Sequence, residues 1–103
     1  MPEGYRAIIA PLLLEQLEEF GIVEQARSAI RDAMADPDRA GKQLTGSLYP
    51  YRRLRVGRYR IIYRVASDTD PPEARFLYCG LRKQGSRKDV YERLYRVLRR
   101  GDL

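Results

Sequence analysis

The sequence contains no histidine, no tryptophan and a single cysteine, Cys79. A lone cysteine cannot form a disulfide within the chain, and without histidine the usual sets of zinc ligands cannot be assembled. We therefore expect no metal site and interpret Cys79 as a buried strand residue. The absence of histidine also removes the side chain that most often transfers protons in enzymes, so any acid–base chemistry needs another residue type.

Long hydrophobic runs are also absent. No apolar stretch approaches the roughly 20 residues of a membrane-spanning helix, and the first residues lack the basic segment and long apolar core of a secretory signal. The hydrophobic fraction of 44% argues against a disordered chain. We expect one cytoplasmic domain that spans residues 1–103, because this length suits a single core and is too short for two.

Negative charge is scarce in the second half of the chain. Residues 49–103 carry fifteen basic and six acidic side chains, net +9, whereas residues 1–48 carry five basic and eight acidic ones, net −3. Positive charge concentrated in this way repels itself unless a partner compensates it. The asymmetry indicates a polyanionic partner, either a nucleic acid or an acidic protein. A solvated basic surface without any partner is the alternative.

The first half of the chain predicts a strand followed by two helices. Residues 5–9 alternate like a short strand, and Pro11 fits the first turn of a helix that ends at Gly21. A second helix is predicted over residues 22–34, where apolar side chains recur at helical spacing. The segment 36–50 is rich in glycine, proline and polar residues, which predicts a connecting loop.

From Tyr51 the hydrophobic period changes to two, which predicts strands. In YRRLRVGRYRIIYRV, residues 51–65, the pair Gly57-Arg58 fits a two-residue hairpin turn with glycine at a position of positive φ. This turn fixes the register, in which the predicted pairs are Val56 with Tyr59, Arg55 with Arg60, Leu54 with Ile61 and Arg53 with Ile62. Leu54, Val56, Tyr59 and Ile61 then form an apolar side that can cover the helices.

The remaining elements complete an α+β domain. Residues 74–80 predict a further strand, and an amphipathic helix is expected from about Asp89 to Arg100. The predicted order is β-α-α-β-β-β-α, with an antiparallel sheet of about four strands. The N-terminal helical hairpin should cover one face of this sheet, and the C-terminal helix should close the domain.

Two arginines at opposed strand positions are the first indication of a binding surface. Like charges such as Arg55 and Arg60 destabilise a strand pair by up to about 1 kcal/mol unless something compensates them. A phosphate backbone lying across the sheet would do so, because guanidinium groups grip phosphate oxygens in bidentate fashion. The alternative is that both arginines point into water or pair with carboxylates. Further cations follow in the next loop, at Arg82, Lys83, Arg87 and Lys88.

A tyrosine beside these cations is a candidate for proton transfer. Cutting RNA without a metal requires a base for the 2′-hydroxyl, cations for the charge on the phosphorane and an acid for the leaving oxygen. Tyr91 is close in sequence to Arg87 and Lys88. From residue chemistry alone, Tyr91 is either this proton-transfer group or a packing residue of the last helix.

Two motifs resemble the RelE/ParE superfamily of toxin–antitoxin toxins. The segment LTGSLYPYRRLRVGRYRIIYRV, residues 44–65, is similar to the strand pair of that superfamily, and GLRKQGSRKDVYERL, residues 80–94, is similar to its closing segment. The first half resembles it only in the order of its elements. Motif coverage is about half of the chain, and the two motifs do not separate the branches of the superfamily.

The resemblance to the RelE-like branch implies a ribosome-dependent mRNA endonuclease that needs no metal or other cofactor. Such toxins enter the decoding site of the ribosome and cut the codon by attack of the 2′-hydroxyl on the adjacent phosphate. By position, Arg60 and Arg82 would stabilise the transition state and Tyr91 would transfer the proton, with Arg87 as the alternative loop arginine. The remaining positions implied to bind RNA are Arg53, Arg55, Arg87 and Lys88. Some members carry lysines where this chain has Arg53 and Arg55, and arginine is a poorer proton carrier.

The resemblance also implies the partners. A cognate antitoxin with an acidic segment is expected to hide the basic face or displace the last helix, whose apolar residues Val90, Leu94 and Val97 are the expected surface for it. Operator DNA is expected to be bound only through the antitoxin, and no membrane is involved. The ParE-like branch is the first alternative, and it implies inhibition of DNA gyrase by binding, without nuclease activity. A relative that binds a partner and is not toxic is the second alternative.

Overall fold

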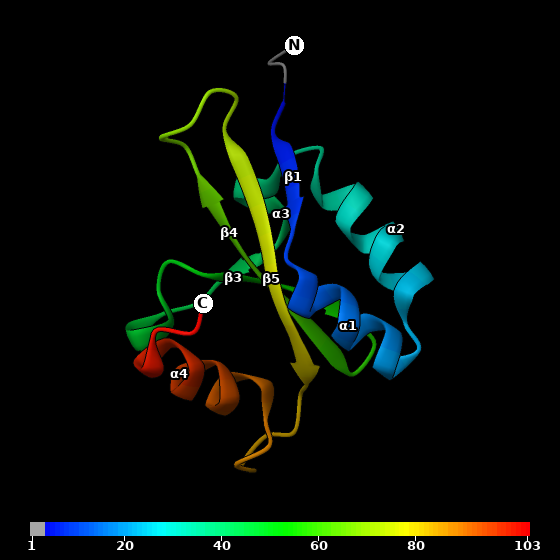
Figure 1. Ribbon diagram of the computed structural model, residues 1–103, viewed down its shortest axis with the longest axis vertical. Coiled ribbons are helices and arrows are strands. Elements are labelled where there is room, and N and C mark those ends of the chain that lie inside the picture. The colour runs from blue at the N-terminus through cyan, green and yellow to red at the C-terminus, as the bar shows by residue number, and fades with distance from the viewer. Residues whose placement is uncertain (1–3) are drawn as a thin grey trace.

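The computed structural model describes residues 4–103, and its centre is a five-stranded sheet in the order β1-β5-β4-β3-β2 (Figure 1). The strands are β1 (Arg6–Ile9), β2 (Lys42–Gln43), β3 (Arg52–Val56), β4 (Tyr59–Ala66) and β5 (Glu73–Leu81). The helices are α1 (Pro11–Phe20), α2 (Val23–Ala33), α3 (Pro37–Ala40), the short 3-10 helix η1 (Gly46–Leu48) and α4 (Val90–Arg100). The predicted α+β class is confirmed.

The first strand joins the sheet in a direction that the sequence did not predict. β1 pairs in parallel with β5, in a register that begins at Arg6 opposite Glu73, whereas every other strand pair is antiparallel. A short alternating run predicts that a strand exists, but it does not show which edge of the sheet the strand joins. Pairing with the open edge of β5 satisfies backbone groups that would otherwise lack partners. The sheet is therefore mixed instead of wholly antiparallel, and it has five strands where about four were predicted.

The hairpin between β3 and β4 has the predicted register. Gly57 has a φ of 59°, and the four predicted cross-strand pairs are all present. Leu54, Val56 and Ile61 lie in a core with Leu13 of α1 and Ala26 of α2. The small side chain of Ala26 is fully buried and lets the helix approach the sheet closely.

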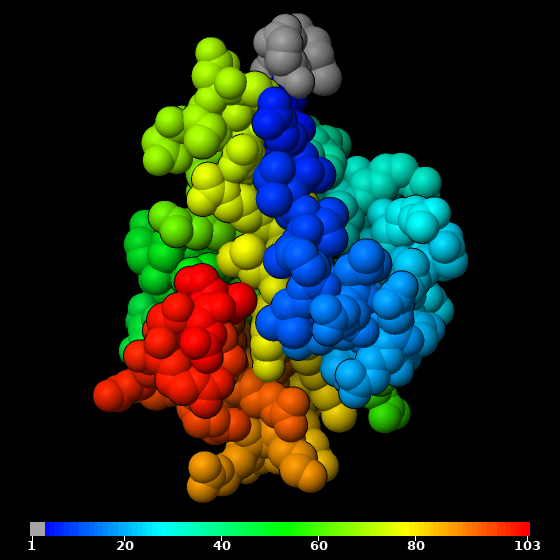
Figure 2. Space-filling view, viewed as in Figure 1, coloured from blue at the N-terminus to red at the C-terminus, as the bar shows by residue number. Residues whose placement is uncertain are grey.

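Helices cover both faces of the sheet. In Figure 2, α1 and α4 lie on either side of β5. On the face opposite the helical hairpin, Val90 and Leu94 of α4 form a second core with Ile62 and Tyr78. Gly80 makes this contact close, because a Cβ there would lie 2.9 Å from Val90 Cγ2. No helix within residues 4–103 is long and apolar enough to cross a membrane.

A buried tyrosine anchors the segment that was predicted to be a connecting loop. The Tyr63 hydroxyl, on a fully buried side chain, donates to the Pro37 carbonyl oxygen at 2.6 Å and accepts from the Gly41 amide at 3.0 Å. Arg52 Nη2 also donates to the Gly41 carbonyl oxygen at 2.5 Å. These contacts hold α3 and β2 against the sheet, so the strand Lys42–Gln43 replaces part of the expected loop.

The single cysteine lies where it was predicted. Cys79 is buried on β5, and its burial raises the pKa of the thiol to about 12. The thiol therefore stays protonated at neutral pH and acts as a small core side chain.

Candidate functional site

A cleft of about 460 Å³ opens on the part of the sheet that α4 leaves uncovered. Five of its lining residues were predicted from the sequence to be catalytic or to bind RNA, namely Arg53, Arg55, Arg60, Arg82 and Tyr91. The others belong to β2 and the turn after it, namely Lys42, Gln43, Leu44 and Thr45. Five of the nine lining side chains are cations and none is acidic, so the cleft suits an anion.

Arg60 lies at the base of this cleft with only 7% of its surface exposed. Its Nη1 donates to the carbonyl oxygens of Gly57 at 3.1 Å and Tyr59 at 2.9 Å, which fixes the direction of the guanidinium. Burial lowers the pKa of Arg60, the nearby Tyr91 opposes that effect, and the like charge of Arg55 reinforces it. Arginine nevertheless keeps its proton at neutral pH, so Arg60 is a fixed positive charge beside the tyrosine.

Arg82 is held between a carboxylate and an aromatic ring. Its Nη1 donates to Asp89 Oδ1 at 2.7 Å, and its guanidinium carbon lies 4.9 Å from the centre of the Tyr91 ring. The ion pair orients the guanidinium and also neutralises part of its charge. Arg60 makes no ion pair within residues 4–103, so it offers the less compensated charge of the two.

Asp89 organises this corner of the cleft, and its side chain is almost completely buried. Oδ1 also accepts from the Lys83 amide at 2.6 Å, and Oδ2 accepts from the Tyr91 amide at 3.1 Å, which caps the first turn of α4. Burial by itself would raise the pKa of Asp89, but the hydrogen bonds from Arg82, Lys83 and Tyr91 outweigh it, so the pKa is lowered. Asp89 is therefore ionised at neutral pH and joins the loop to the helix.

Two of the predicted RNA-binding residues come from alternate positions of β3. Arg55 lies opposite Arg60, and Arg53 lies opposite Ile62 on the same face. Neither forms an ion pair within the described chain, and the same holds for Arg60, so the predicted alternative that Arg55 and Arg60 pair with carboxylates does not occur there. Both arginines line the cleft with their charges available.

The loop cations divide between two places. Arg87 lines an adjoining hollow of about 320 Å³, which shares Arg82 and Tyr91 with the cleft. Lys88 is exposed and lines neither cavity. Of the two candidate loop arginines, Arg82 is therefore the one in the cleft and Arg87 is its neighbour.

The apolar residues predicted to meet the antitoxin are not a free surface while α4 is docked. Val90 and Leu94 are fully buried against Ile62 and Tyr78, and Val97 is partly buried at the same core. The three residues do lie on one face of the helix, as their spacing predicts, but that face packs on the sheet. Contact with a partner at these residues would require α4 to leave its place.

Sequence reasoning missed the wall formed by residues 42–45 and the role of Asp89. The wall belongs to a two-residue strand, which is too short to show a period. Asp89 did carry a signal, because an aspartate directly before an apolar helical pattern is typical of an N-cap. Its bond to Arg82 could not be predicted without the path of the loop between them.

Comparison with known proteins agrees with this architecture. Residues 7–73 match the model of the ParE toxin family, described as the ParE toxin of the type II toxin–antitoxin system parDE. The chain belongs to the ParE toxin family. It is thus a toxin of a type II toxin–antitoxin system in the RelE/ParE superfamily, which confirms the resemblance found in its motifs and implies a cognate antitoxin.

Among solved structures, the toxin is similar to a YoeB/ParE toxin from Agrobacterium tumefaciens. The two share 18% sequence identity with a TM-score of 0.63, and the match covers 76% of this chain and 99% of the other. At this identity the likeness concerns the fold alone. A search of curated proteins gave no significant match.

Proposed function

We propose that this toxin is a ribosome-dependent mRNA endonuclease that arrests translation without a metal or other cofactor. The observation that carries the proposal is that Arg60, Arg82 and Tyr91, from three separate segments, line one cleft together with Arg53 and Arg55. A surface that only bound an acidic protein would not need a buried guanidinium and a phenol hydroxyl at the same point. A site that cleaves phosphodiesters without a metal needs a fixed positive charge and a group that exchanges protons, and these two side chains can supply them.

The reaction supported by these groups is attack of a ribose 2′-hydroxyl on the adjacent phosphate. A bond forms between O2′ and phosphorus, the bond from phosphorus to O5′ breaks, one proton leaves the 2′-hydroxyl and one reaches O5′. The products are a 2′,3′-cyclic phosphate and a free 5′-hydroxyl. In this scheme Arg60 stabilises the charge that develops on the phosphorane oxygens, because it is fixed in place and has no carboxylate partner in the described chain.

Tyr91 is the proton-transfer group in this scheme. Its backbone is fixed by the Asp89 cap, and its ring is fixed against Arg82. Among the other lining side chains, the arginines, the amide, the leucine and the threonine do not exchange protons readily, and Lys42 lies two strands away from Arg60, on β2 opposite Arg53. The ordered tyrosine therefore takes the role that histidine has in many ribonucleases, with Arg82 binding a phosphate oxygen beside it.

The experiment that tests this function maps mRNA 5′ ends by primer extension in a reconstituted translation reaction. Tyr91→Phe keeps the ring and removes the hydroxyl, and we expect it to lower the cleavage rate by about 10²–10⁴-fold. Tyr95→Phe is the matched control, because Tyr95 is exposed on the same helix and, among residues 4–103, its hydroxyl forms a hydrogen bond only with Arg99. Equal cutting by the wild type and Tyr91→Phe would remove Tyr91 from the chemistry.

Inhibition of DNA gyrase by binding is the second candidate, and the match to the ParE family favours it. The matched residues, 7–73, contain the arginines of the hairpin but end before Arg82 and Tyr91. The match therefore includes Arg60 but not Arg82 and Tyr91, the other two residues assigned to the cleavage. A purified supercoiling assay separates the candidates: a gyrase inhibitor blocks supercoiling and leaves ribosome-bound mRNA intact, whereas the nuclease does the reverse.

The cognate antitoxin can neutralise such a site in two ways. An acidic segment can cover the cations of the cleft, or a segment of the antitoxin can replace α4 on the sheet. The second way would expose Val90 and Leu94 and would remove Tyr91 from the cleft at the same time, since these residues share the helix. We expect hydrogen exchange to distinguish them, because only displacement would increase the exchange of α4 amides in the complex.

A further inference from the structure

A row of basic side chains continues from the cleft to the outer edge of the sheet. Arg60 of β4 lies opposite Arg55 of β3, and Arg53, two residues along β3, lies opposite Lys42 of β2. Opposed residues share a face of a sheet, and so do residues two apart on one strand. The four cations therefore occupy one face. The row takes one strand spacing of about 4.8 Å from β4 to β3, a step of about 7 Å along β3, and a second strand spacing of about 4.8 Å to β2. It is therefore longer than a single phosphate group.

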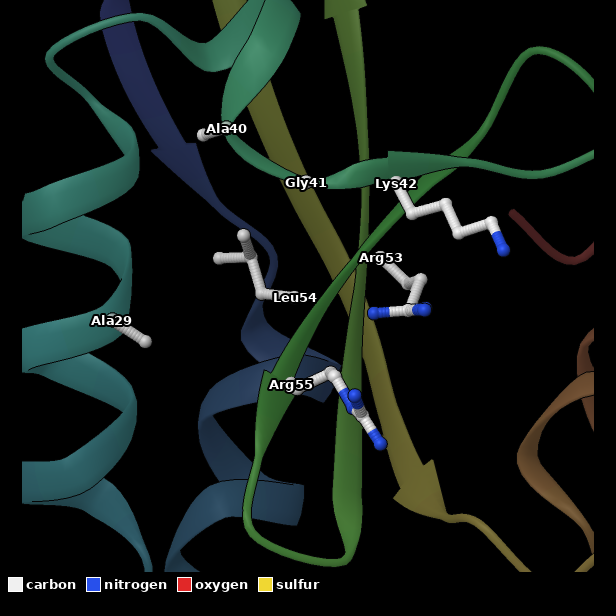
Figure 3. Close-up of a pocket in the computed structure, with 7 residues that line it drawn as sticks. All are labelled: Ala29, Ala40, Gly41, Lys42, Arg53, Leu54 and Arg55. Carbon is white, nitrogen blue, oxygen red and sulfur yellow. The ribbon is translucent and has the colours of Figure 1, made fainter.

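A second hollow of about 480 Å³ lies at the far end of this row. It shares Lys42, Arg53 and Arg55 with the cleft, so the two cavities adjoin along these three side chains. In Figure 3, the three cations extend to one side of β3, while Leu54 extends toward the helix that carries Ala29. The rest of its lining is small or apolar, namely Ala29, Ala40, Gly41 and Leu54.

The hollow exists because β2 is short. Its two residues pair only with Arg52 and Arg53, so the rest of β3 is an edge of the sheet. The wall that carries Lys42 is nevertheless fixed, because the Tyr63 hydroxyl and Arg52 bind Gly41 directly before it. Lys42 forms no ion pair within residues 4–103, and in Figure 3 its side chain extends to the same side of β3 as that of Arg53.

We propose that Lys42 and Arg53 bind a second phosphate, next to the one attacked at Arg60, and that the hollow holds the adjoining nucleoside. This inference rests on the proposed function in that the ligand is a single strand of RNA. The strand then crosses β4 and β3 on the cation face and passes over the free edge of β3 beyond β2, where the ribose or base reaches Leu54 and Ala29 on the other side. Lys42 becomes a substrate-binding residue that acts on affinity and not on the chemical step.

The test measures binding of a fluorescein-labelled 2′-O-methyl RNA hexanucleotide by anisotropy over a range of salt concentrations. Each phosphate contact to a single strand contributes about 0.7 to the slope of log K against log salt. Lys42→Gln should therefore reduce the slope by about 0.7 and weaken binding about fivefold at 0.1 M salt. Arg6→Gln is the matched control, because Arg6 is an exposed cation on β1, at the opposite edge of the sheet. Its slope should equal that of the wild type.

A 2′-O-methyl dinucleotide, used as a competitor, shows which phosphate has lost its contact in Lys42→Gln. It has one internal phosphate, which the cleft binds at Arg60, so Lys42→Gln should leave its affinity unchanged. An unchanged slope for the hexanucleotide, an equal loss in Arg6→Gln, or an equal loss for the dinucleotide would each overturn the second phosphate site.

The outcome is independent of cleavage. 2′-O-methyl RNA cannot undergo attack by its own 2′-oxygen, so the binding data are the same whether or not the toxin is a nuclease. If the toxin leaves ribosome-bound mRNA intact but Lys42→Gln reduces the salt slope of RNA binding, the nuclease proposal is wrong and the second phosphate site is retained. A toxin that cuts mRNA but shows no Lys42 effect would overturn only the second phosphate site.

Discussion

Removal of the Tyr63 hydroxyl should destabilise the fold and loosen one wall of the cleft. The hydroxyl is the only group that joins the Pro37 carbonyl oxygen to the Gly41 amide among the side-chain contacts of the described residues. Tyr63→Phe keeps the ring, which stacks on Phe76 with ring centres 5.0 Å apart. The substitution therefore removes the hydrogen bonds and leaves most of the packing unchanged.

The expected cost follows from the groups left without partners. A buried donor or acceptor that loses its partner costs about 1–3 kcal/mol. Tyr63→Phe leaves one of each, at Gly41 and Pro37, and also removes the acceptor of Arg52 Nε, while Arg52 Nη2 still binds the Gly41 carbonyl oxygen. We expect the free energy of unfolding to fall by about 2–6 kcal/mol, which is a large part of the roughly 5–15 kcal/mol typical of small proteins.

Urea unfolding measures this cost directly. Tyr78→Phe is the control, because Tyr78 is also buried but its hydroxyl makes no hydrogen bond with residues 4–103. We expect the control to change the unfolding free energy by less than about 0.5 kcal/mol. If Tyr63→Phe costs no more than Tyr78→Phe, the argument that this hydroxyl anchors the wall is wrong. If it does anchor the wall, Tyr63→Phe should also lower the salt slope of RNA binding as Lys42→Gln does.

Three further predictions concern the cleft and its supports. Arg60→Ala should reduce single-turnover cleavage on programmed ribosomes by about 10²–10³-fold, and a smaller effect would assign the phosphorane charge to another residue. The pKa of Asp89 is lowered by folding, so its stabilisation is complete above its unfolded pKa near 3.8 and is lost as the pH falls through the lower folded value. Asp89→Asn should therefore flatten the fall in unfolding free energy below about pH 4, as measured by urea titrations. Gly80→Ala should place a methyl group against Val90, cost about 1–3 kcal/mol and speed hydrogen exchange in α4; unchanged exchange would contradict this close contact.

The hairpin could be predicted from sequence because local rules determine it. Gly57 supplies the positive φ of the turn, and the period of two then assigns every side chain of both strands to a face. The shared face of Arg53, Arg55 and Arg60 follows from these two rules alone. The apolar period of the last helix likewise assigns Val90 and Leu94 to one face.

The parts that could not be predicted depend on contacts between distant segments. The strand Lys42–Gln43 exists because Tyr63, more than twenty residues later, binds Gly41. β1 pairs with β5 because that edge of the sheet is open, and nothing in a four-residue strand encodes the choice. Val90 and Leu94 are buried because they pack on Ile62 and Tyr78, which lie opposite each other on β4 and β5, and the helical period of α4 does not show which surface it packs on.

The cleft is supported at two points outside the reacting groups, and this determines how distant substitutions would act on it. Asp89 binds Arg82 and caps the helix that carries Tyr91, so a change that displaces α4 would move the proton-transfer group and one phosphate contact together. Tyr63 holds the wall of Lys42, so a change there would alter RNA affinity and leave Arg60 and Tyr91 in place. Leu94→Ala, in the α4 core, should therefore lower the rate of the chemical step, whereas Tyr63→Phe should weaken binding. If Leu94→Ala lowered only the affinity, as Tyr63→Phe should, the docking of α4 would not be what positions Tyr91.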